Sequence, residues 1–160
     1  MTPDEPWNPW RALRAQPHIE LRFAYLGGRR GLWQRDELGD LIVLDAELGR
    51  RSRRSVLAHE LLHAERGIGA GAASARTMER EEESVRREVA RRLVPQAALV
   101  THLAARLGVD GSVGPADLEE EFDVDPDVAR KALELLFFDL RSRSPRPQRR
   151  FLLGEADGLA

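Results

Sequence analysis

The feature of this chain that most constrains its fold is a short motif in which His59 and His63 stand four residues apart and Glu60 directly follows the first histidine. Positions i and i+4 of an α-helix lie on one face, so both imidazoles can reach a single metal ion. Glu60 points too far round the helix to share that ion, but its carboxylate can reach a water molecule on the ion, where a general base is needed. This HExxH spacing is typical of zinc hydrolases and predicts a helix with two metal ligands and one base.

The residues around the motif favour a helix that is buried over most of its surface. One ionisable stripe runs along it, and apolar residues stand on both sides. The stripe consists of Val56, His59, Glu60 and His63, and the flanking residues are Leu57, Leu61, Ala58 and Leu62. We expect such a helix to lie in the core with its stripe facing a cleft. The alternative is a core helix that carries these polar residues by chance, but a glutamate without a partner would then cost free energy.

A zinc ion held by two histidines needs a further protein ligand, and the absence of cysteine leaves a carboxylate as the expected third group. The next long helix is rich in glutamate, and its buried face is marked by Val85 and Val89. Glu82 extends that face by one turn, which favours it as the ligand. Glu81, four residues before Val85, remains an alternative, and Glu82 could instead form an ion pair with Arg86.

The hydrophobic pattern predicts an α+β protein. Alternation of apolar and polar residues predicts strands at residues 18–25, 31–34 and 40–45. Helical periodicity, glycines and prolines predict the motif helix ending at Gly67 and further helices at residues 11–15, 77–94, 96–107, 117–122 and 127–138. Gly67, Gly69 and Gly71 suggest a mobile loop between the two long helices.

One domain is expected over residues 1–140, with a helix-turn-helix-like pair at 115–140. Residues 141–160, which begin with an arginine-rich stretch, are expected to form a disordered basic tail. The basic run at residues 50–54 is expected to be the solvated first turn of the motif helix.

Charge and composition narrow the expected partners and location. The net charge of -2 provides no general attraction to nucleic acid or to an anionic membrane. Residues 117–127 carry seven acidic and no basic residues, the wrong sign for a phosphate backbone, so we expect the helical pair to pack against the core or a protein. Neither a membrane span nor a signal peptide is recognisable, and a cytoplasmic location is expected. His18 and His102 stand apart from the motif and are expected to be structural or exposed.

Three stretches carry a resemblance to a known family. Residues 59–67, 80–85 and 90–95 resemble the ImmA/IrrE family of metallo-endopeptidases, and most closely the short versions found in actinobacteria and their phages. The resemblance covers roughly residues 9–136. Better-known members have a Glu-Ala pair where this chain has Ser84 and Val85, so the assignment of the third ligand to Glu82 follows the phage-like versions.

The resemblance implies a zincin-like core, with a small antiparallel sheet beside the HExxH helix and a glutamate-bearing helix, followed by C-terminal helices. It implies zinc held by His59, His63 and Glu82, with Glu60 as the catalytic base. It also implies cleavage of a specific regulatory protein, such as a helix-turn-helix repressor. Two other hypotheses are a non-catalytic, metal-stabilised binding or regulatory protein of a phage or mobile element, and a DNA-associated regulator that uses the C-terminal helices and the arginine tail.

Overall fold

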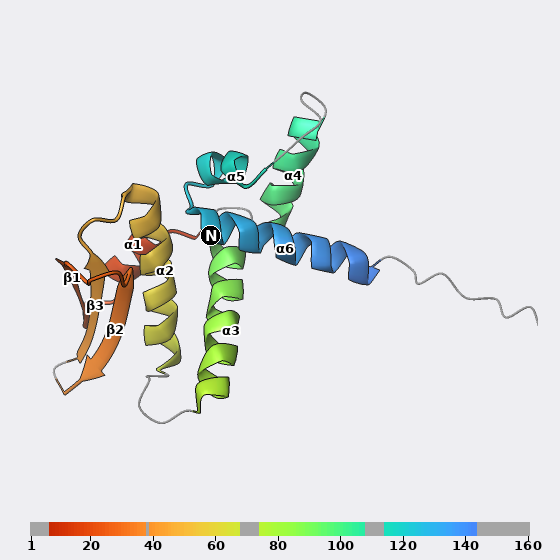
Figure 1. Ribbon diagram of the computed structural model, residues 1–160. Coiled ribbons are helices and arrows are strands. Elements are labelled where there is room, and N and C mark those ends of the chain that lie inside the picture. Colours follow the sequence, from red (N-terminus) through yellow and green to blue (C-terminus); the bar gives the residue numbers. More distant parts are fainter. Residues whose placement is uncertain (1–6, 38, 68–73, 108–113, 144–160) are drawn as a thin grey trace, which may run out of the picture.

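The computed structural model describes residues 7–37, 39–67, 74–107 and 114–143. These residues form an α+β structure in which one small sheet stands beside a set of helices (Figure 1). The elements in chain order are α1 (Pro9–Arg14), β1 (Ile19–Ala24), β2 (Gly31–Asp36), β3 (Gly39–Asp45), α2 (Arg50–Arg66), α3 (Ala75–Leu93), α4 (Gln96–Leu107), α5 (Pro115–Glu121) and α6 (Pro126–Arg143). Each expected strand and helix has a counterpart, with ends that differ by a few residues.

Two boundaries bear on the expected loop and tail. Helix α2 ends because Gly67 adopts a left-handed conformation with φ 65°, which glycine tolerates and other residues resist. The expected loop glycines Gly69 and Gly71 lie outside the described residues. At the other end, α6 continues through Arg143, so the expected disordered tail does not begin at Arg141. Residues 144–160 lie outside the described part of the chain.

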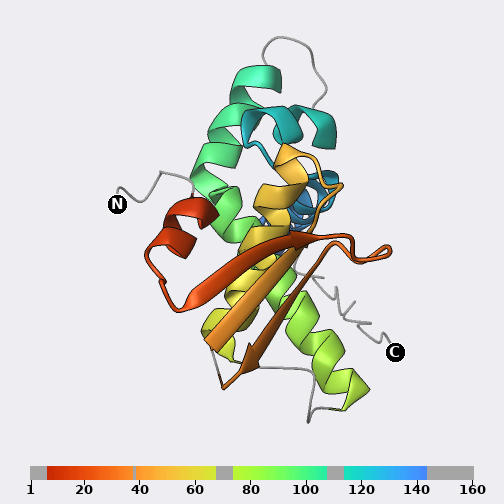
Figure 2. The same ribbon diagram turned by 90° about the vertical axis from the view of Figure 1, so that its left-hand side faces the viewer.

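Helix α2, the motif helix, lies between the sheet and α3 (Figures 1 and 2). Its two apolar sides belong to two separate clusters. On the sheet side, Leu57 and Leu61 pack with Ile42 of β3, and all three are fully buried. On the other side, Leu62 packs into the cluster that α2 forms with α3, α4, α5 and α6. The predicted buried helix with apolar flanks is thus confirmed, and burial of this kind contributes about 1.5–3 kcal/mol for each large aliphatic side chain.

The sheet is mixed, so the expected antiparallel sheet is wrong for one of its two pairings. The strand order is β1-β3-β2. β2 and β3 form an antiparallel pair, whereas β1 and β3 run parallel. A short connection between two strands usually makes them antiparallel neighbours. Here β1 and β2 are not hydrogen-bonded to each other, because β3 lies between them. The central position suits β3 because its residues 41–44 are nearly all buried.

A side chain at the end of β3 holds this arrangement together. Both oxygens of the buried Asp45 carboxylate accept hydrogen bonds from backbone N–H groups, at 2.7 Å from Leu26 and 2.9 Å from Glu47. The Asp45 backbone N–H also donates to the Arg30 carbonyl, just before β2. The turn that crosses from β1 to β2 is therefore tied to the end of the strand that separates them.

The basic run at the start of α2 docks the C-terminal helices. The expected solvated first turn fits Arg50, whose side chain is 80% exposed, but not Arg54, which is partly buried against the turn between α5 and α6. Arg54 donates to the carbonyls of Phe122 and Asp123 at 3.0 and 3.1 Å, in the turn between α5 and α6. Arg50 and Arg51 pair with the Asp123 carboxylate. Carbonyls at the end of a short helix need donors, and Arg54 supplies them. The helix-turn-helix-like pair packs on the core as a result.

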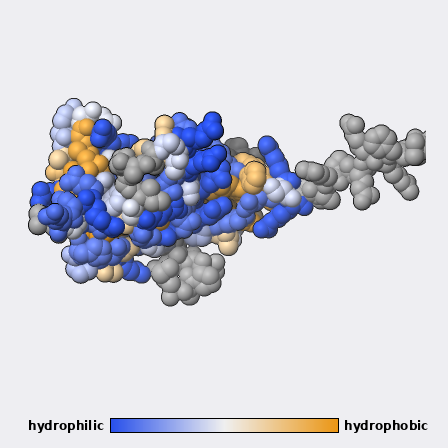
Figure 3. Space-filling view, turned by 90° about the horizontal axis from the view of Figure 1, so that it is seen from below, coloured by the Kyte–Doolittle hydropathy of each residue, from blue (hydrophilic) through white to orange (hydrophobic). Residues whose placement is uncertain are grey.

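The face of the molecule seen from below is largely hydrophilic (Figure 3). Apolar residues show through over the sheet and towards the projecting end of α6. The large apolar side chains exposed at that end are Phe137, Phe138 and Leu140. Among the helices described, none combines the length and apolar composition that crossing a membrane requires.

A buried carboxylate links the sheet to the end of the motif helix. The Asp40 side chain, only 4% exposed, accepts two hydrogen bonds from Arg35, at 2.7 and 2.9 Å, and one from the Trp33 indole at 3.0 Å. Arg35 also donates to the Ala64 carbonyl at 3.1 Å, in the last turn of α2. The hydrogen bonds from Arg35, helped by that from Trp33, lower the pKa of Asp40 although burial opposes the shift.

We predict that Asp40→Asn lowers the free energy of unfolding by about 1–3 kcal/mol, because it removes an acceptor and leaves Arg35 and Trp33 poorly paired. The value should fall in the lower part of that range, since Arg35 is 50% exposed and water can replace part of the interaction. Urea unfolding of both proteins measures the difference. Because folding lowers the pKa of Asp40, its contribution is present above about pH 4 and is lost as the pH falls further. The two unfolding curves should therefore converge in acid; a constant difference would contradict the assignment.

Candidate metal centre

Helices α2 and α3 bring three candidate ligands to one point. The Nε2 atoms of His59 and His63 lie 3.1 Å apart. One oxygen of Glu82, from α3, lies 3.0 Å from His63 Nε2, and the other lies 3.3 Å from His59 Nε2. The candidate ligand atoms of the three residues all lie within 4.8 Å of one another. The group could therefore hold a metal ion.

The spacing of these atoms suits a small divalent cation. Bonds of about 2.0–2.1 Å in a tetrahedral site place neighbouring ligand atoms about 3.3 Å apart. The 3.1 Å between the two imidazole nitrogens is close to that value, as are the 3.0 and 3.3 Å that separate each nitrogen from a different oxygen of Glu82. Two imidazoles and one carboxylate are also a donor set that zinc accepts. Within the described residues the group has three members, which leaves a tetrahedral ion one open position.

The two glutamates weighed as the third ligand lie in different surroundings. Glu81 forms an ion pair with Arg66 at 2.7 Å, beside the end of α2, and does not belong to the group. Glu82 faces both histidines, and its expected alternative partner Arg86 is 4.0 Å away. Glu82, which extends the buried face of α3, is thus the glutamate that belongs to the group.

The electrostatics of the group follow from these contacts. The hydrogen bond with His59 is the main cause that lowers the pKa of Glu82 to about 2, although burial opposes it. Burial lowers the pKa of His63, because it penalises the charged imidazolium. A deprotonated carboxylate and a neutral imidazole are the forms in which these side chains bind metal ions.

Glu60 lies beside the group but does not belong to it. Glu60 is 7% exposed, and its burial raises the pKa of the carboxyl to about 7. The neighbouring His59 and a hydrogen bond from the Trp33 backbone lower this pKa and so oppose the effect of burial. Part of this burial comes from Gly31 of β2. A Cβ atom at position 31 would lie 2.5 Å from Val56 Cγ1 and 2.9 Å from a Glu60 oxygen, so only glycine permits this close approach.

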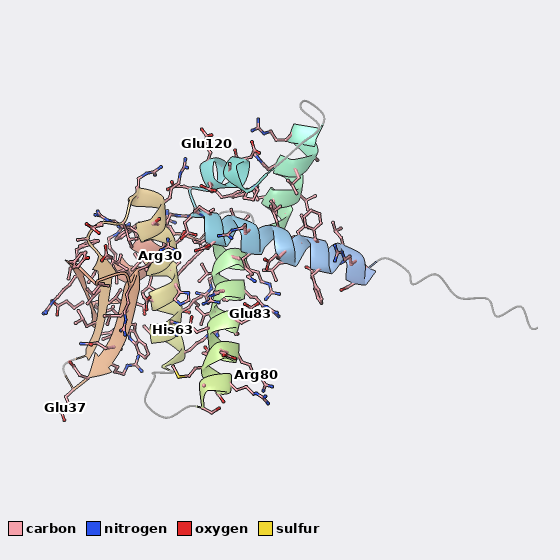
Figure 4. The ribbon with its side chains drawn as sticks, in the orientation of Figure 1. Arg30, Glu37, His63, Arg80, Glu83 and Glu120 are labelled. Atoms are coloured by element: carbon pink, nitrogen blue, oxygen red, sulfur yellow. The ribbon has the colours of Figure 1, made fainter. Side chains whose placement is uncertain are left out.

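His59 and Glu82 of the group, together with Glu60, line a cleft of about 610 Å³. α2 contributes its polar stripe, the start of β2 and α3 stand on either side, and α6 provides a further wall. Figure 4 shows Arg30 on the sheet side, His63 on α2 and Glu83 on α3. The expected position of the polar stripe at a cleft is confirmed for Val56, His59 and Glu60, whereas His63 is not among the lining residues.

The position of α6 depends on residues that the sequence analysis did not single out. Arg30, just before β2, forms an ion pair with Asp125, whose side chain is almost fully buried. Asp125 also accepts from the Val128 backbone N–H at 3.0 Å, and its own backbone N–H donates to the Ser55 hydroxyl of α2 at 3.1 Å. These contacts join the sheet, α2 and the start of α6. An acidic residue directly before Pro126 is a helix-start signal that could have indicated the role of Asp125.

The other two histidines outside the motif lie away from the group. His18 is exposed and approaches Asp40 at 3.8 Å. His102 on α4 lies 3.5 Å from a Glu121 oxygen and packs edge-on against Phe122. Both positions agree with the expectation that these residues are structural or exposed.

Comparison with known proteins adds no family to this geometry. No family model matches the chain, and no curated protein matches it either.

We predict that a bound metal ion stabilises the fold. Free zinc at about 100 times the dissociation constant contributes about 2.7 kcal/mol, which at about 2–4 °C per kcal/mol for a chain of this size raises the melting temperature by about 5–11 °C. Adding a chelator to the zinc-loaded protein should reverse the shift, and calorimetry measures it. Because the candidate ligands lie outside the two apolar clusters, the clusters should persist without the ion, and the chelated protein should still unfold cooperatively. His63→Ala is the control, in which the chelator should change nothing. An unchanged melting curve for protein shown to contain zinc would contradict the site.

We also predict that Glu82→Gln weakens zinc binding by at least about 100-fold, because the amide has lost the charge that pairs with the cation. Glu81→Gln should leave the affinity nearly unchanged, since Glu81 pairs with Arg66. Glu88→Gln is a matched control on the same helix, where Glu88 pairs with Arg92. Competition with a chromogenic chelator measures all three. A loss in Glu81→Gln with normal binding in Glu82→Gln would transfer the role to Glu81.

Proposed function

We propose that this protein is a zinc-dependent endopeptidase that cleaves a specific regulatory protein in the cytoplasm. The observation that carries the proposal is the position of Glu60. This buried carboxylate adjoins the three-residue group without belonging to it, and with His59 and Glu82 it lines a cleft of about 610 Å³. A structural metal site needs no base at an open position, whereas a hydrolytic site does.

Each residue has a distinct part in the proposed reaction. His59, His63 and Glu82 would hold the ion. Zinc, when bound, supplies Lewis-acid chemistry that activates water and polarises the peptide carbonyl. Glu60 accepts the proton of the attacking water and later delivers it to the leaving amine. Its burial between Gly31 and α2 keeps bulk water away from the carboxylate.

The resemblance of residues 59–67, 80–85 and 90–95 to ImmA/IrrE metallo-endopeptidases supports a peptide substrate, and a helix-turn-helix repressor is the substrate class it implies. The cleft is in keeping with this proposal, because about 610 Å³ accommodates a few residues of an extended chain. Specific cleavage of one partner also suits a peptidase that works among other cytoplasmic proteins.

We predict that Glu60→Gln retains zinc and the fold but abolishes cleavage, because glutamine has the shape of glutamate but its amide accepts no proton near neutral pH. A loss of about 100-fold or more is expected from removing a general base. The assay incubates the candidate repressor with zinc-loaded protein and identifies products by mass spectrometry. The variant should bind the repressor and leave it intact, while the unaltered protein cuts it at one or a few bonds.

His63→Ala is the companion variant, and it should lose both the metal and the activity because two ligands do not hold the ion firmly. Zinc content and melting temperature distinguish this loss from the loss of the base. If the unaltered protein and Glu60→Gln both bind the repressor and both leave it uncut, the protein is a metal-stabilised binding or regulatory protein instead.

A further inference from the structure

The charges around the cleft bear on the substrate of the proposed reaction. Basic side chains stand on three of its walls, at the start of β2, on α3 and on α6. They are Arg29, Arg30, Arg86, Arg130 and Lys131. Cationic side chains near the group of His59, His63 and Glu82 attract anionic partners. The ion pairs that each cation already forms within the protein show which positive charges remain available to a ligand.

Most of these cations are neutralised by the protein itself. Their acidic partners stand mainly on α6, with one on α3. The ion pairs are Arg30 with Asp125 and Asp127, Arg130 with Asp127, and Lys131 with Glu83 and Glu134. Arg30 and Lys131 thus join the start of α6 to the sheet side and to α3, whereas Arg130 is paired within α6.

Arg86 and Arg29 differ from the others. Arg86 has an ion pair only with Glu82, at 4.0 Å, within the described part of the chain, and its side chain is 60% exposed. So long and exposed a pair contributes little, and Glu82 would be committed to the metal. Arg29 is exposed at the start of β2, and no described residue forms an ion pair with it. The cleft therefore retains two guanidinium groups, one on the sheet side and one on α3.

We propose that the cleft binds a peptide segment with acidic side chains next to the bond to be cleaved, and that Arg86 is the specificity-determining residue. This inference rests on the proposed peptidase function, because it names the substrate class of the same site. Arg86 stands one turn after Glu82 on the same face of α3, so a carboxylate that it binds lies close to the ion. A guanidinium binds a carboxylate through two parallel hydrogen bonds. Arg29 contributes a second positive charge from the wall formed by β2.

The test measures binding rather than cleavage. Zinc-loaded Glu60→Gln protein is titrated into rhodamine-labelled peptides of alternating alanine and glutamate, and into the matching alanine–glutamine and alanine–lysine peptides, with fluorescence anisotropy as the readout. The glutamate peptide should bind about tenfold or more tightly than the glutamine peptide at low ionic strength, and the difference should shrink at high ionic strength.

Variants of Arg86 supply the decisive comparison. Arg86→Gln in this background should weaken binding of the glutamate peptide about tenfold and leave the glutamine peptide unaffected. Arg86→Glu should reverse the preference towards the lysine peptide. Arg91→Gln is the matched control, because Arg91 is an exposed arginine of α3 outside the cleft lining. Zinc content is measured in every variant, since Arg86 is a neighbour of Glu82.

Each result separates this inference from the function on which it rests. Equal binding of the glutamate peptide in the Glu60→Gln protein and its Arg86→Gln form would overturn the acidic subsite, because carboxylates would then be binding the zinc alone. An equal loss in Arg91→Gln would overturn it as well, since a general surface charge would explain the binding. Arg86-dependent binding without any cleavage by the unaltered protein would leave the subsite standing and remove the peptidase.

Discussion

The burial of α2 between two apolar clusters is the constraint on which the rest of the structure depends. Leu57 and Leu61 face the sheet, and Leu62 faces the helices, so only one stripe of the helix remains for polar groups. A carboxylate or an imidazole on a buried helix is costly unless it meets a partner. The fold meets this requirement by placing Glu82 of α3 opposite the two histidines, and by opening a cleft along the stripe.

Charged side chains hold both ends of this helix, and their burial decides how much they contribute. At the end of α2, Arg35 connects the Ala64 carbonyl to the buried Asp40. At its start, Arg54 donates to the turn between α5 and α6. Exposed ion pairs such as Arg87 with Glu83 add little stability. Pairs with one buried carboxylate are different, because loss of either partner leaves an unpaired group.

The same contacts make α6 part of the cleft rather than an appendage. Arg30 and Ser55 both bind Asp125, which directly precedes α6. The sheet and the motif helix together therefore orient α6, the wall of the cleft that lies across from α2. The acidic linker between α5 and α6, which would repel a nucleic-acid backbone, is used here to pair with arginines of α2. Ion pairs between arginines and the aspartates that precede α6 thus explain both the docking of the helical pair and the position of α6 beside the cleft.

The sequence by itself determined the local elements and which side chains of the motif share one face of its helix. Helical spacing places His59, Glu60 and His63 on one stripe, and the apolar residues beside them require burial, because both follow from the period of 3.6 residues. The same period favoured Glu82 over Glu81, because Glu82 extends the buried face of Val85 and Val89 by one turn. These are short-range relations, and short-range relations can be read from residue types alone.

The tertiary structure decided what depends on residues far apart in the chain. The insertion of β3 between β1 and β2, the approach of Gly31 to Glu60, and the pairing of Arg30 with Asp125 all join segments that no periodicity relates. The basic run beginning at Arg50 shows the limit most clearly. A run of arginines in the first turn of a helix is solvated unless carbonyls and carboxylates reach it, and whether they do depends on where the chain returns some 70 residues later.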